Sequence, residues 1–302
     1  MHAGRSPGAI EVPGDRPYPS TVEREHDSPR STGAPAANDL AAGLVIDGVT
    51  ARYGADAVLH DVSVSARAGE VTGLIGPNGS GKTTLVRVAS RALRPWRGSV
   101  RVSGHDPYEL SARRAARLVA VVPQDVGSAF SYSALEIVLM GRSPYHSPWG
   151  GGSAQDWHEV REAMRATSVE HLADRPFDEL SGGERQAVVL AQALAQSAPV
   201  MLLDEPTTHL DLRHVVDVLR LLRSLAKRDD KTVLGIFHDL NLAAAYCDQI
   251  VALSDGRVAA GGSPEEVITQ PLLRDVFGID ARVVPNEDSG KPVVVLEGPD
   301  DR

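Results

Sequence analysis

The chain of 302 residues lacks several features that would place it in other classes of protein. Its single cysteine, Cys247, excludes an internal disulfide framework and indicates a reducing compartment. No apolar run approaches the roughly 20 residues that span a bilayer, so we expect a partner to hold the protein wherever it works at a membrane. Lysine and arginine number 31 against 40 aspartates and glutamates. This net acidity argues against a general nucleic-acid binder, whose surface is usually basic.

Apolar patterning divides the chain into three predicted parts. Residues 1–40 are rich in Pro, Gly, Ser, Ala and charge, and are predicted to form a disordered tail. From residue 44, alternating strands are followed by buried strands that alternate with helices, which predicts a parallel α/β sheet. Residues 44–270 are therefore assigned to one large domain, mostly helical over about 125–197. Residues 271–302 are predicted to add a C-terminal helix and hairpin.

The stretch GPNGSGKTT, residues 76–84, fits the phosphate-loop pattern G-x-x-x-x-G-K-[ST]. It follows an apolar strand and precedes a helix predicted from Lys82 to about Ala92, whose N-terminus also favours anions. Lysine in this pattern adds charge beside the β and γ phosphates, and the hydroxyl after it can bind Mg²⁺. The expected ATP-contacting residues are Gly76, Pro77, Asn78, Gly79, Ser80, Gly81, Lys82, Thr83 and Thr84.

Two carboxylates end the apolar strand VMLLDEP, residues 200–206. Burying carboxylates at a sheet edge is costly unless a cation or a proton donor needs them. Asp204 is positioned to coordinate Mg²⁺ together with Thr83. Glu205 is positioned to orient and deprotonate an attacking water. A solvated turn after the strand is the alternative.

Six motifs stand in one order along the chain. They are the phosphate loop, Gln124 after a strand, LSGGERQ at 180–186, the two carboxylates, HLDL at 209–212 and His238 in FHD. This set resembles the ATPase subunit of ABC transporters over roughly residues 44–270. The resemblance implies a P-loop NTPase core with a parallel sheet, an antiparallel β subdomain and an inserted helical subdomain.

The resemblance also implies roles for four residues outside the phosphate loop. Gln124 would reach Mg²⁺ and water and link the site to a membrane subunit, and His238 would hold the γ-phosphate and the base Glu205. Asp211 would cross a dimer interface. Tyr53, in TARYG, would stack on adenine. Each of three residues also has a purely structural alternative. Tyr53 would then be a core residue of an edge strand, Gln124 an ordinary polar residue at a strand end, and His238 a merely buried histidine.

The stretch LSGGERQ has two interpretations. Ser181 and Glu184 satisfy the S-x-x-E capping-box pattern, so the stretch predicts a helix start. Capping alone does not require Gly182 and Gly183, which would expose bare N–H groups at the positive end of the helix. The resemblance implies that two subunits stack head to tail, so that each LSGGERQ closes over the ATP of the other subunit.

Finer similarities point to one group within the family. The stretches 133–146, 204–214, 238–262 and 281–294 look like those of importers of ferric siderophores, haem and vitamin B12. In that group the GR-x-P run lies where the helical part grips the permease. Gly141, Arg142 and Pro144 are therefore expected in or near the coupling surface, with a plain helix end as the alternative.

The sequence thus predicts the MgATP-hydrolysing subunit of an importer for an iron chelate, haem or corrinoid. It would be a homodimer at the cytoplasmic face of the cell membrane, bound to transmembrane permease subunits and served indirectly by an external solute-binding protein. Nucleic acid is not an expected partner. An importer ATPase for another small solute, and a soluble ABC-type ATPase without a permease, are the alternatives.

Overall fold

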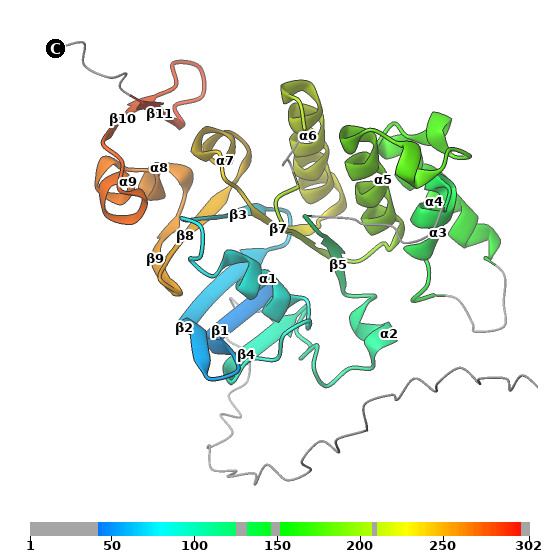
Figure 1. Ribbon diagram of the computed structural model, residues 1–302, viewed down its shortest axis with the longest axis horizontal. Helices are drawn as coiled ribbons and strands as arrows, with labels where there is room; N and C mark the ends of the chain where they lie inside the picture. Colours follow the sequence, from blue (N-terminus) through cyan, green and yellow to red (C-terminus); the bar gives the residue numbers. More distant parts are fainter. Residues whose placement is uncertain (1–41, 125–131, 146–151, 207–209, 297–302) are drawn as a thin grey trace, which may run out of the picture. The chain divides into compact units, whose positions relative to one another are not determined.

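A computed structural model describes residues 42–124, 132–145, 152–206 and 210–296. These parts contain a three-stranded sheet, a six-stranded sheet, a two-stranded hairpin and a group of helices (Figure 1). The expected tail, 1–40, lies outside the described residues, as do residues 125–131, 146–151 and 207–209. In the described parts, no helix is long and apolar enough to cross a bilayer.

The first sheet is antiparallel and contains β1 (Ala42–Tyr53), β2 (Asp56–Arg67) and β4 (Arg97–Val102) in the order β2-β1-β4. Alternate residues of β2, from Val62 to Ala66, are buried, as the alternating sequence pattern predicts, and Leu59 is also buried beyond a register shift. The inward side chains join one hydrophobic cluster with those of helix α1 (Lys82–Ala89). This packing fixes α1, and therefore the loop before it, against the antiparallel sheet.

The second sheet has six strands in the order β5-β6-β7-β3-β8-β9. All its neighbouring pairs are parallel except β8–β9, a hairpin at one edge. Strands β3, β6 and β7 are buried throughout, because they lie inside the sheet and both of its faces are covered. The strands are β3 (Val71–Ile75), β5 (Val119–Val122), β6 (Val200–Leu203), β7 (Thr232–Ile236), β8 (Gln249–Ser254) and β9 (Arg257–Gly262).

Several helices begin where the sequence places a capping residue. Ser133, Ser153, Ser181 and Ser263 each accept a hydrogen bond from the backbone N–H of the third helical residue, and an acidic side chain there closes the capping box. The larger helices are α3 (Ala134–Met140), α4 (Ala154–Ala166), α5 (Gly182–Ala195), α6 (Leu212–Asp229), α7 (Leu240–Tyr246) and α9 (Gln270–Phe277); α2 (Ala112–Ala115) and α8 (Pro264–Val267) are single turns.

The structure confirms the expected alternation of strands and helices, with differences at element ends. Helix α1 stops at Ala89, three residues before the predicted end at Ala92. Residues 167–181 hold short 3₁₀ turns, at Glu170–Leu172 and Phe177–Glu179, where a mostly helical stretch was expected. The predicted last hairpin is β10 (Ala281–Pro285) paired with β11 (Pro292–Leu296).

Candidate functional site

The loop between β3 and α1 forms a cradle with an open face. Gly76, Gly79 and Gly81 have φ of 145°, 82° and 100°, in the region that only glycine adopts without strain. A Cβ at Gly76 would lie 2.2 Å from the carbonyl oxygen of Leu253, whereas a Cβ at Gly79 would meet nothing within 4 Å. The first glycine is therefore required by close packing, and the second lies beside open space.

Lys82 begins α1 and turns back over this loop. Its Nζ donates to the carbonyl oxygens of Gly76 at 2.8 Å and Pro77 at 2.9 Å. A lysine carries three N–H donors, and these bonds use two of them. Burial lowers the pKa of Lys82, while the charges of Glu205 and Asp204 act in the opposite direction. The ammonium thus lies in a partly dehydrated place, where its attraction to an anion is strengthened.

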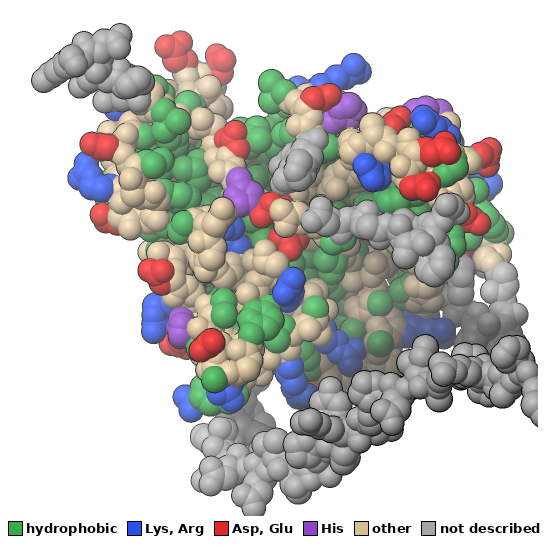
Figure 2. Space-filling view, in the orientation of Figure 1, with side chains coloured by type: hydrophobic (Ala, Val, Ile, Leu, Met, Phe, Trp, Pro, Cys, Tyr) green, Lys and Arg blue, Asp and Glu red, His purple; other side chains and the backbone are tan. Residues whose placement is uncertain are grey.

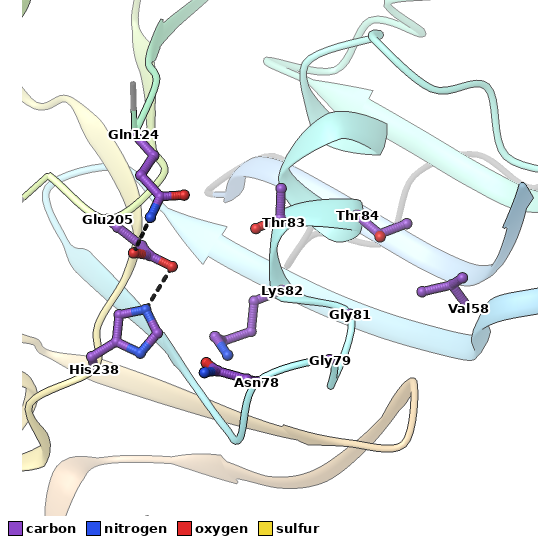
Figure 3. Close-up of a pocket in the computed structure, with 10 residues that line it drawn as sticks. All are labelled: Val58, Asn78, Gly79, Gly81, Lys82, Thr83, Thr84, Gln124, Glu205 and His238. Atoms are coloured by element: carbon purple, nitrogen blue, oxygen red, sulfur yellow. Dashed lines mark hydrogen bonds and ion pairs between the residues drawn. The ribbon is translucent and has the colours of Figure 1, made fainter. Parts of the chain in front are cut away.

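Three elements bring their polar ends together at the carboxyl edge of the large sheet. Gln124 follows β5, Glu205 follows β6 and His238 follows β7. Gln124 Nε2 donates to Glu205 Oε2 at 2.7 Å, and His238 Nε2 lies 2.6 Å from Glu205 Oε1 (Figure 3). The Glu205 carboxylate is therefore held from both sides, as a base that must be oriented requires.

The backbone at Glu205 is unusual for a residue with a side chain. Its φ is 54°, in the left-handed region, although it precedes Pro206, a position that favours extended backbone. Such a conformation costs about 1–3 kcal/mol and persists where the surrounding structure imposes it. Strain of this kind concentrates at functional sites, and here it aims the carboxylate at Gln124 and His238.

Together these elements enclose a cavity of about 470 Å³. Its lining joins the loop to the carboxyl ends of the strands, and comprises Val58, Asn78, Gly79, Gly81, Lys82, Thr83, Thr84, Gln124, Glu205 and His238 (Figure 3). Val58 is the member that sequence reasoning missed. No alternation pattern identifies it, because Val58 is in phase with the buried residues Val62, Val64 and Ala66. A register shift between Val62 and Leu59 reverses the phase of the strand, so that Leu59 is buried and Val58 lines the cavity.

The residues beside the cavity fit a bound Mg²⁺. Thr83 Oγ1 donates to Asp204 Oδ1 at 3.2 Å, so two hard oxygen atoms are adjacent. Burial raises the pKa of Asp204, and a cation beside the carboxylate would act in the opposite direction. Among the described residues, no group of three or more His, Cys, Asp or Glu side chains could hold a metal alone. Mg²⁺ instead uses one or two carboxylates together with substrate phosphates, which matches this pair.

Tyr53 lies at the end of β1, next to the site but outside its lining. Its side chain is 43% exposed, so it is not a core residue. Its hydroxyl accepts a hydrogen bond from Arg87 Nη1 at 3.1 Å, which ties the ring to α1. The ring therefore stands on the surface near the phosphate loop, and its expected adenine contact stays a prediction.

The residues of LSGGERQ lie elsewhere in the chain. Ser181 caps α5, and Glu184 Oε2 accepts from Ser181 N at 2.8 Å and Oγ at 2.7 Å. A Cβ at Gly182 would meet nothing within 4 Å, so this helix start faces open space. Ser181, Gly182 and Gly183 do not line the cavity of the phosphate loop. One chain therefore brings together its own loop, carboxylates, glutamine and histidine, but not this helix start.

Asp211 caps α6, and His214 of α6 lies near the start of α5. Asp211 Oδ1 accepts from His214 N at 2.9 Å and approaches His214 Nδ1 at 2.8 Å. A Cβ at Gly183 would lie 3.7 Å from the ring of His214. The other part of the HLDL motif, at 209, lies outside the described residues.

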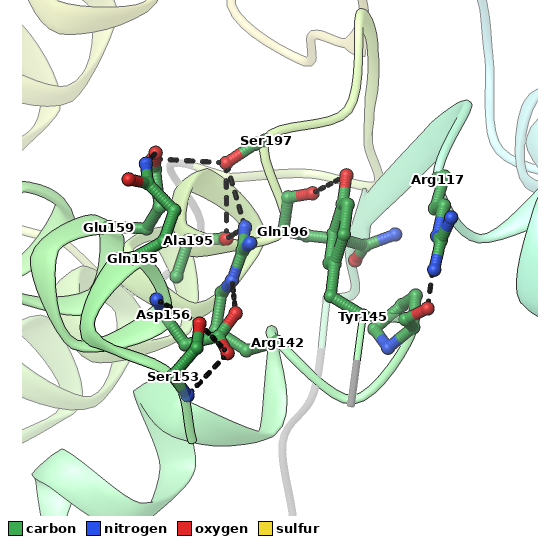
Figure 4. A network of polar contacts seen from close by, with 11 residues as sticks. Arg117, Arg142, Tyr145, Ser153, Gln155, Asp156, Glu159, Ala195, Gln196 and Ser197 are labelled. Carbon is green, nitrogen blue, oxygen red and sulfur yellow. Dashed lines mark hydrogen bonds and ion pairs between the residues drawn. The ribbon is translucent and has the colours of Figure 1, made fainter. Parts of the chain in front are cut away.

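The residues of the GR-x-P run are buried within the chain. Gly141, Arg142 and Pro144 therefore do not themselves form a surface for a partner, and their expected place near a coupling surface stays a prediction. Arg142 Nε contacts Asp156 Oδ1 at 2.9 Å, and its Nη1 donates to Ala195 O at 2.7 Å and Ser197 Oγ at 3.0 Å (Figure 4). The side chain closes the C-terminal end of α5 instead. The sequence could not show this, because Asp156 and Ala195 are distant along the chain.

The fold and the cavity define a P-loop NTPase, and comparison with known proteins identifies its family. Residues 59–208 match the family model described as ABC transporter. A hemin import ATP-binding protein of Streptomyces coelicolor is 46% identical over 82% of this chain and 88% of its own length. The chain belongs to the ATP-binding proteins of ABC transporters.

Other relatives are named for the import of different solutes. A cobalamin import ATP-binding protein of Halobacterium salinarum is 42% identical over 86% of this chain, and the match covers 64% of that protein's length. An iron(3+)-hydroxamate import ATP-binding protein of Bacillus subtilis is 39% identical over 80% of this chain and 90% of its own. The chain thus resembles relatives with three different solutes.

Solved structures show the same fold. A transporter described as of metal-chelate type, in an inward-facing conformation, has a TM-score of 0.74 at 28% identity, with coverage of 84% of this chain and 97% of that one. A dimeric ATP-binding cassette with bound ADP and Pi has a TM-score of 0.65 at 27% identity, covering 73% and 98%. The comparison therefore includes both a transporter and a cassette dimer.

Proposed function

We propose that this protein hydrolyses MgATP to drive import of an iron chelate, haem or corrinoid through a membrane permease. The observation that carries the ATPase part is the fixed carboxylate of Glu205, held by Gln124 and His238 across a cavity from Lys82. The solute class is supported by the names of the relatives, which mention hemin, cobalamin, siderophores and iron(3+)-hydroxamate.

In this proposal each side chain of the site has one task in hydrolysis. Glu205 would deprotonate a water for in-line attack on the γ-phosphate, and its two hydrogen-bonded oxygens give it one orientation. Lys82 and the loop N–H groups would stabilise the phosphate charge. His238 would hold Glu205 and reach the γ-phosphate. Thr83 and Asp204 would hold Mg²⁺, with Gln124 near it; the ion neutralises phosphate charge when bound.

Completion of the site requires a second copy of the chain. Ser181, Gly182 and Gly183 form an open helix start away from the chain's own cavity. A head-to-tail homodimer would place this anion-binding start over the partner's ATP, with Asp211 at the junction. The dimeric cassette among the similar structures supports this arrangement. The ring of Tyr53 would stack on the adenine of ATP.

The dimer would be bound peripherally to permease subunits at the cytoplasmic face, with an external protein delivering the solute. Figure 2 shows acidic and basic side chains interspersed over the visible face, which is not the one-signed basic surface typical of nucleic-acid binders. A soluble ATPase without a permease is the rival function. Stimulation of ATPase activity by nucleic acid, without association with a permease, would favour that rival.

The assigned base is tested by Glu205→Gln, which keeps the shape and removes the proton acceptor. ATP binding is expected to persist, while turnover falls about 10²–10⁴-fold, the usual contribution of general acid–base catalysis. Binding is measured by equilibrium dialysis and turnover by phosphate release. Glu109→Gln, at an exposed position, is the matched control.

Normal turnover in Glu205→Gln would remove Glu205 from the role of base. The solute class is tested separately, by co-expression with the permease and uptake of labelled ferric siderophore, haem and corrinoid into cells. Uptake of none of the three, together with uptake of another solute, would refute the solute class and leave the ATPase assignment intact.

A further inference from the structure

Asn241 links the segment after His238 to the C-terminal hairpin. Its Oδ1 accepts the backbone N–H of Val294 at 2.7 Å, and its Nδ2 donates to the Val294 carbonyl at 3.2 Å. Asp239 caps α7 by accepting the N–H groups of Asn241 and Leu242. The first turn of α7, which begins two residues after His238, is thus attached both to its own cap and to β11.

The hairpin also holds the other end of α7. Lys291, just before β11, donates from Nζ to the carbonyl oxygens of Ala245 at 3.0 Å and Cys247 at 3.2 Å. Arg223 Nη1, from α6, donates to the same Ala245 carbonyl at 3.1 Å. Positive charge at this end of a helix is favourable. The hairpin therefore contacts the start and the end of a helix of only seven residues.

The position of α7 depends on these contacts. Isolated helices shorter than about 12–15 residues are marginal in water, so a short helix is placed by its tertiary partners. The hairpin is itself anchored, because Val283 and Val294 pack against the large hydrophobic cluster that includes Ala243 and Ala244 of α7. His238 stands directly before this helix, with 45% of its side chain exposed, and approaches Glu205 at 2.6 Å.

We propose that the β10–β11 hairpin is a brace for hydrolysis, and that Asn241 is the positioning residue through which it holds α7 and sets His238 against Glu205. This inference rests on the proposed function, because it concerns the same ATPase site. The hairpin is absent from the cavity lining, so its effect on turnover is indirect, and its hydrogen bonds to α7 are the route that the proposal assigns.

Two substitutions separate the brace from simple helix stability. Alanine is the best helix former, and aspartate in the first turn is favourable to a helix, so neither Asn241→Ala nor Asn241→Asp weakens α7 itself. Both lose the Nδ2 donor. Each is expected to lower kcat about threefold to tenfold, from the loss of one or two neutral hydrogen bonds, with KM for ATP within about twofold of wild type. Wild-type kcat in both variants would overturn the brace.

A second substitution tests the partner strand in the full chain. The backbone N–H and carbonyl of Val294 both form hydrogen bonds with Asn241. Val294→Pro therefore removes the N–H donor to Asn241 and leaves the hydrogen bonds between β11 and β10 in place. If the two residues act through one contact, Asn241→Ala with Val294→Pro lowers kcat no more than the stronger single change. A double effect equal to the product of the single effects would also overturn the brace.

Controls distinguish this proposal from the proposed function. Glu287→Ala, exposed in the hairpin turn, is expected to leave kcat unchanged. Melting temperatures, followed by circular dichroism, set an assay temperature at which every variant is folded. A wild-type chain without ATPase activity would refute the proposed function itself. Wild-type turnover that depends on Glu205 but not on Asn241 would refute the brace alone.

Discussion

The buried pair of Arg142 and Asp156 predicts a large loss of stability on a small chemical change. Arg142 is 4% exposed and Asp156 5% exposed, and Asp156 Oδ2 also accepts from Ser153 N at 2.8 Å and Ser153 Oγ at 2.6 Å. Asp156→Asn keeps the shape and leaves a buried guanidinium without its counter-charge. Breaking a buried pair in this way costs about 3–5 kcal/mol. For a chain of this size the melting temperature falls by about 6–20 °C.

The pH dependence of this loss follows from the pKa of Asp156. Burial alone would raise the pKa, but the hydrogen bonds from Ser153 and the charge of Arg142 outweigh it, so the pKa lies below its ordinary value of 3.8. A carboxyl group whose pKa is lowered on folding stabilises the folded protein at pH values above its ordinary pKa. That stabilisation is lost as the pH falls below the ordinary pKa. The difference in free energy of unfolding between wild type and Asp156→Asn is therefore constant from about pH 5 to 8 and shrinks below about pH 4.

Urea unfolding at several pH values measures this difference directly. Asp217→Asn, exposed on α6, is the matched control and is expected to change stability by less than about 0.5 kcal/mol. A loss below about 1 kcal/mol for Asp156→Asn at pH 7, or a loss that varies between pH 5 and 8, would refute the reasoning. A small loss would mean that water solvates the Arg142–Asp156 pair. A loss that varies with pH would mean that another group titrates together with the pair.

The remaining predictions concern the dimer and the cysteine. Mixing Ser181→Arg chains with Lys82→Ala chains should give dimers with one complete site, because the intact Lys82 loop of one chain faces the intact Ser181 of the other. These mixed dimers should trap ATP, whereas neither homodimer should. No trapping in the mixture would contradict the head-to-tail arrangement. The Cys247 thiol is fully buried and burial raises its pKa, so alkylation near pH 8 should be at least about tenfold slower in the folded protein than in urea. Equal rates would show that this part of the core opens readily.

Local sequence patterns predicted most of the fold correctly. The alternating strands β1 and β2, the buried strands β3, β6 and β7 and the capped helices follow from side-chain period and from capping serines, which act over a few residues. The phosphate loop is equally local, because Gly76, Gly79 and Gly81 supply backbone angles that the loop itself needs. Element ends were less accurate, as the early end of α1 at Ala89 shows.

The amino-acid sequence by itself determined the strand and helix types, the nucleotide loop and the family, since each is encoded in contiguous residues. Only the tertiary structure decided which distant side chains meet. It placed Val58 in the cavity lining, buried Arg142 against Asp156 where a partner surface was expected, and joined Asn241 to Val294. These contacts depend on how separate elements pack, and a pattern read along one segment carries no information about the residue that another segment brings beside it.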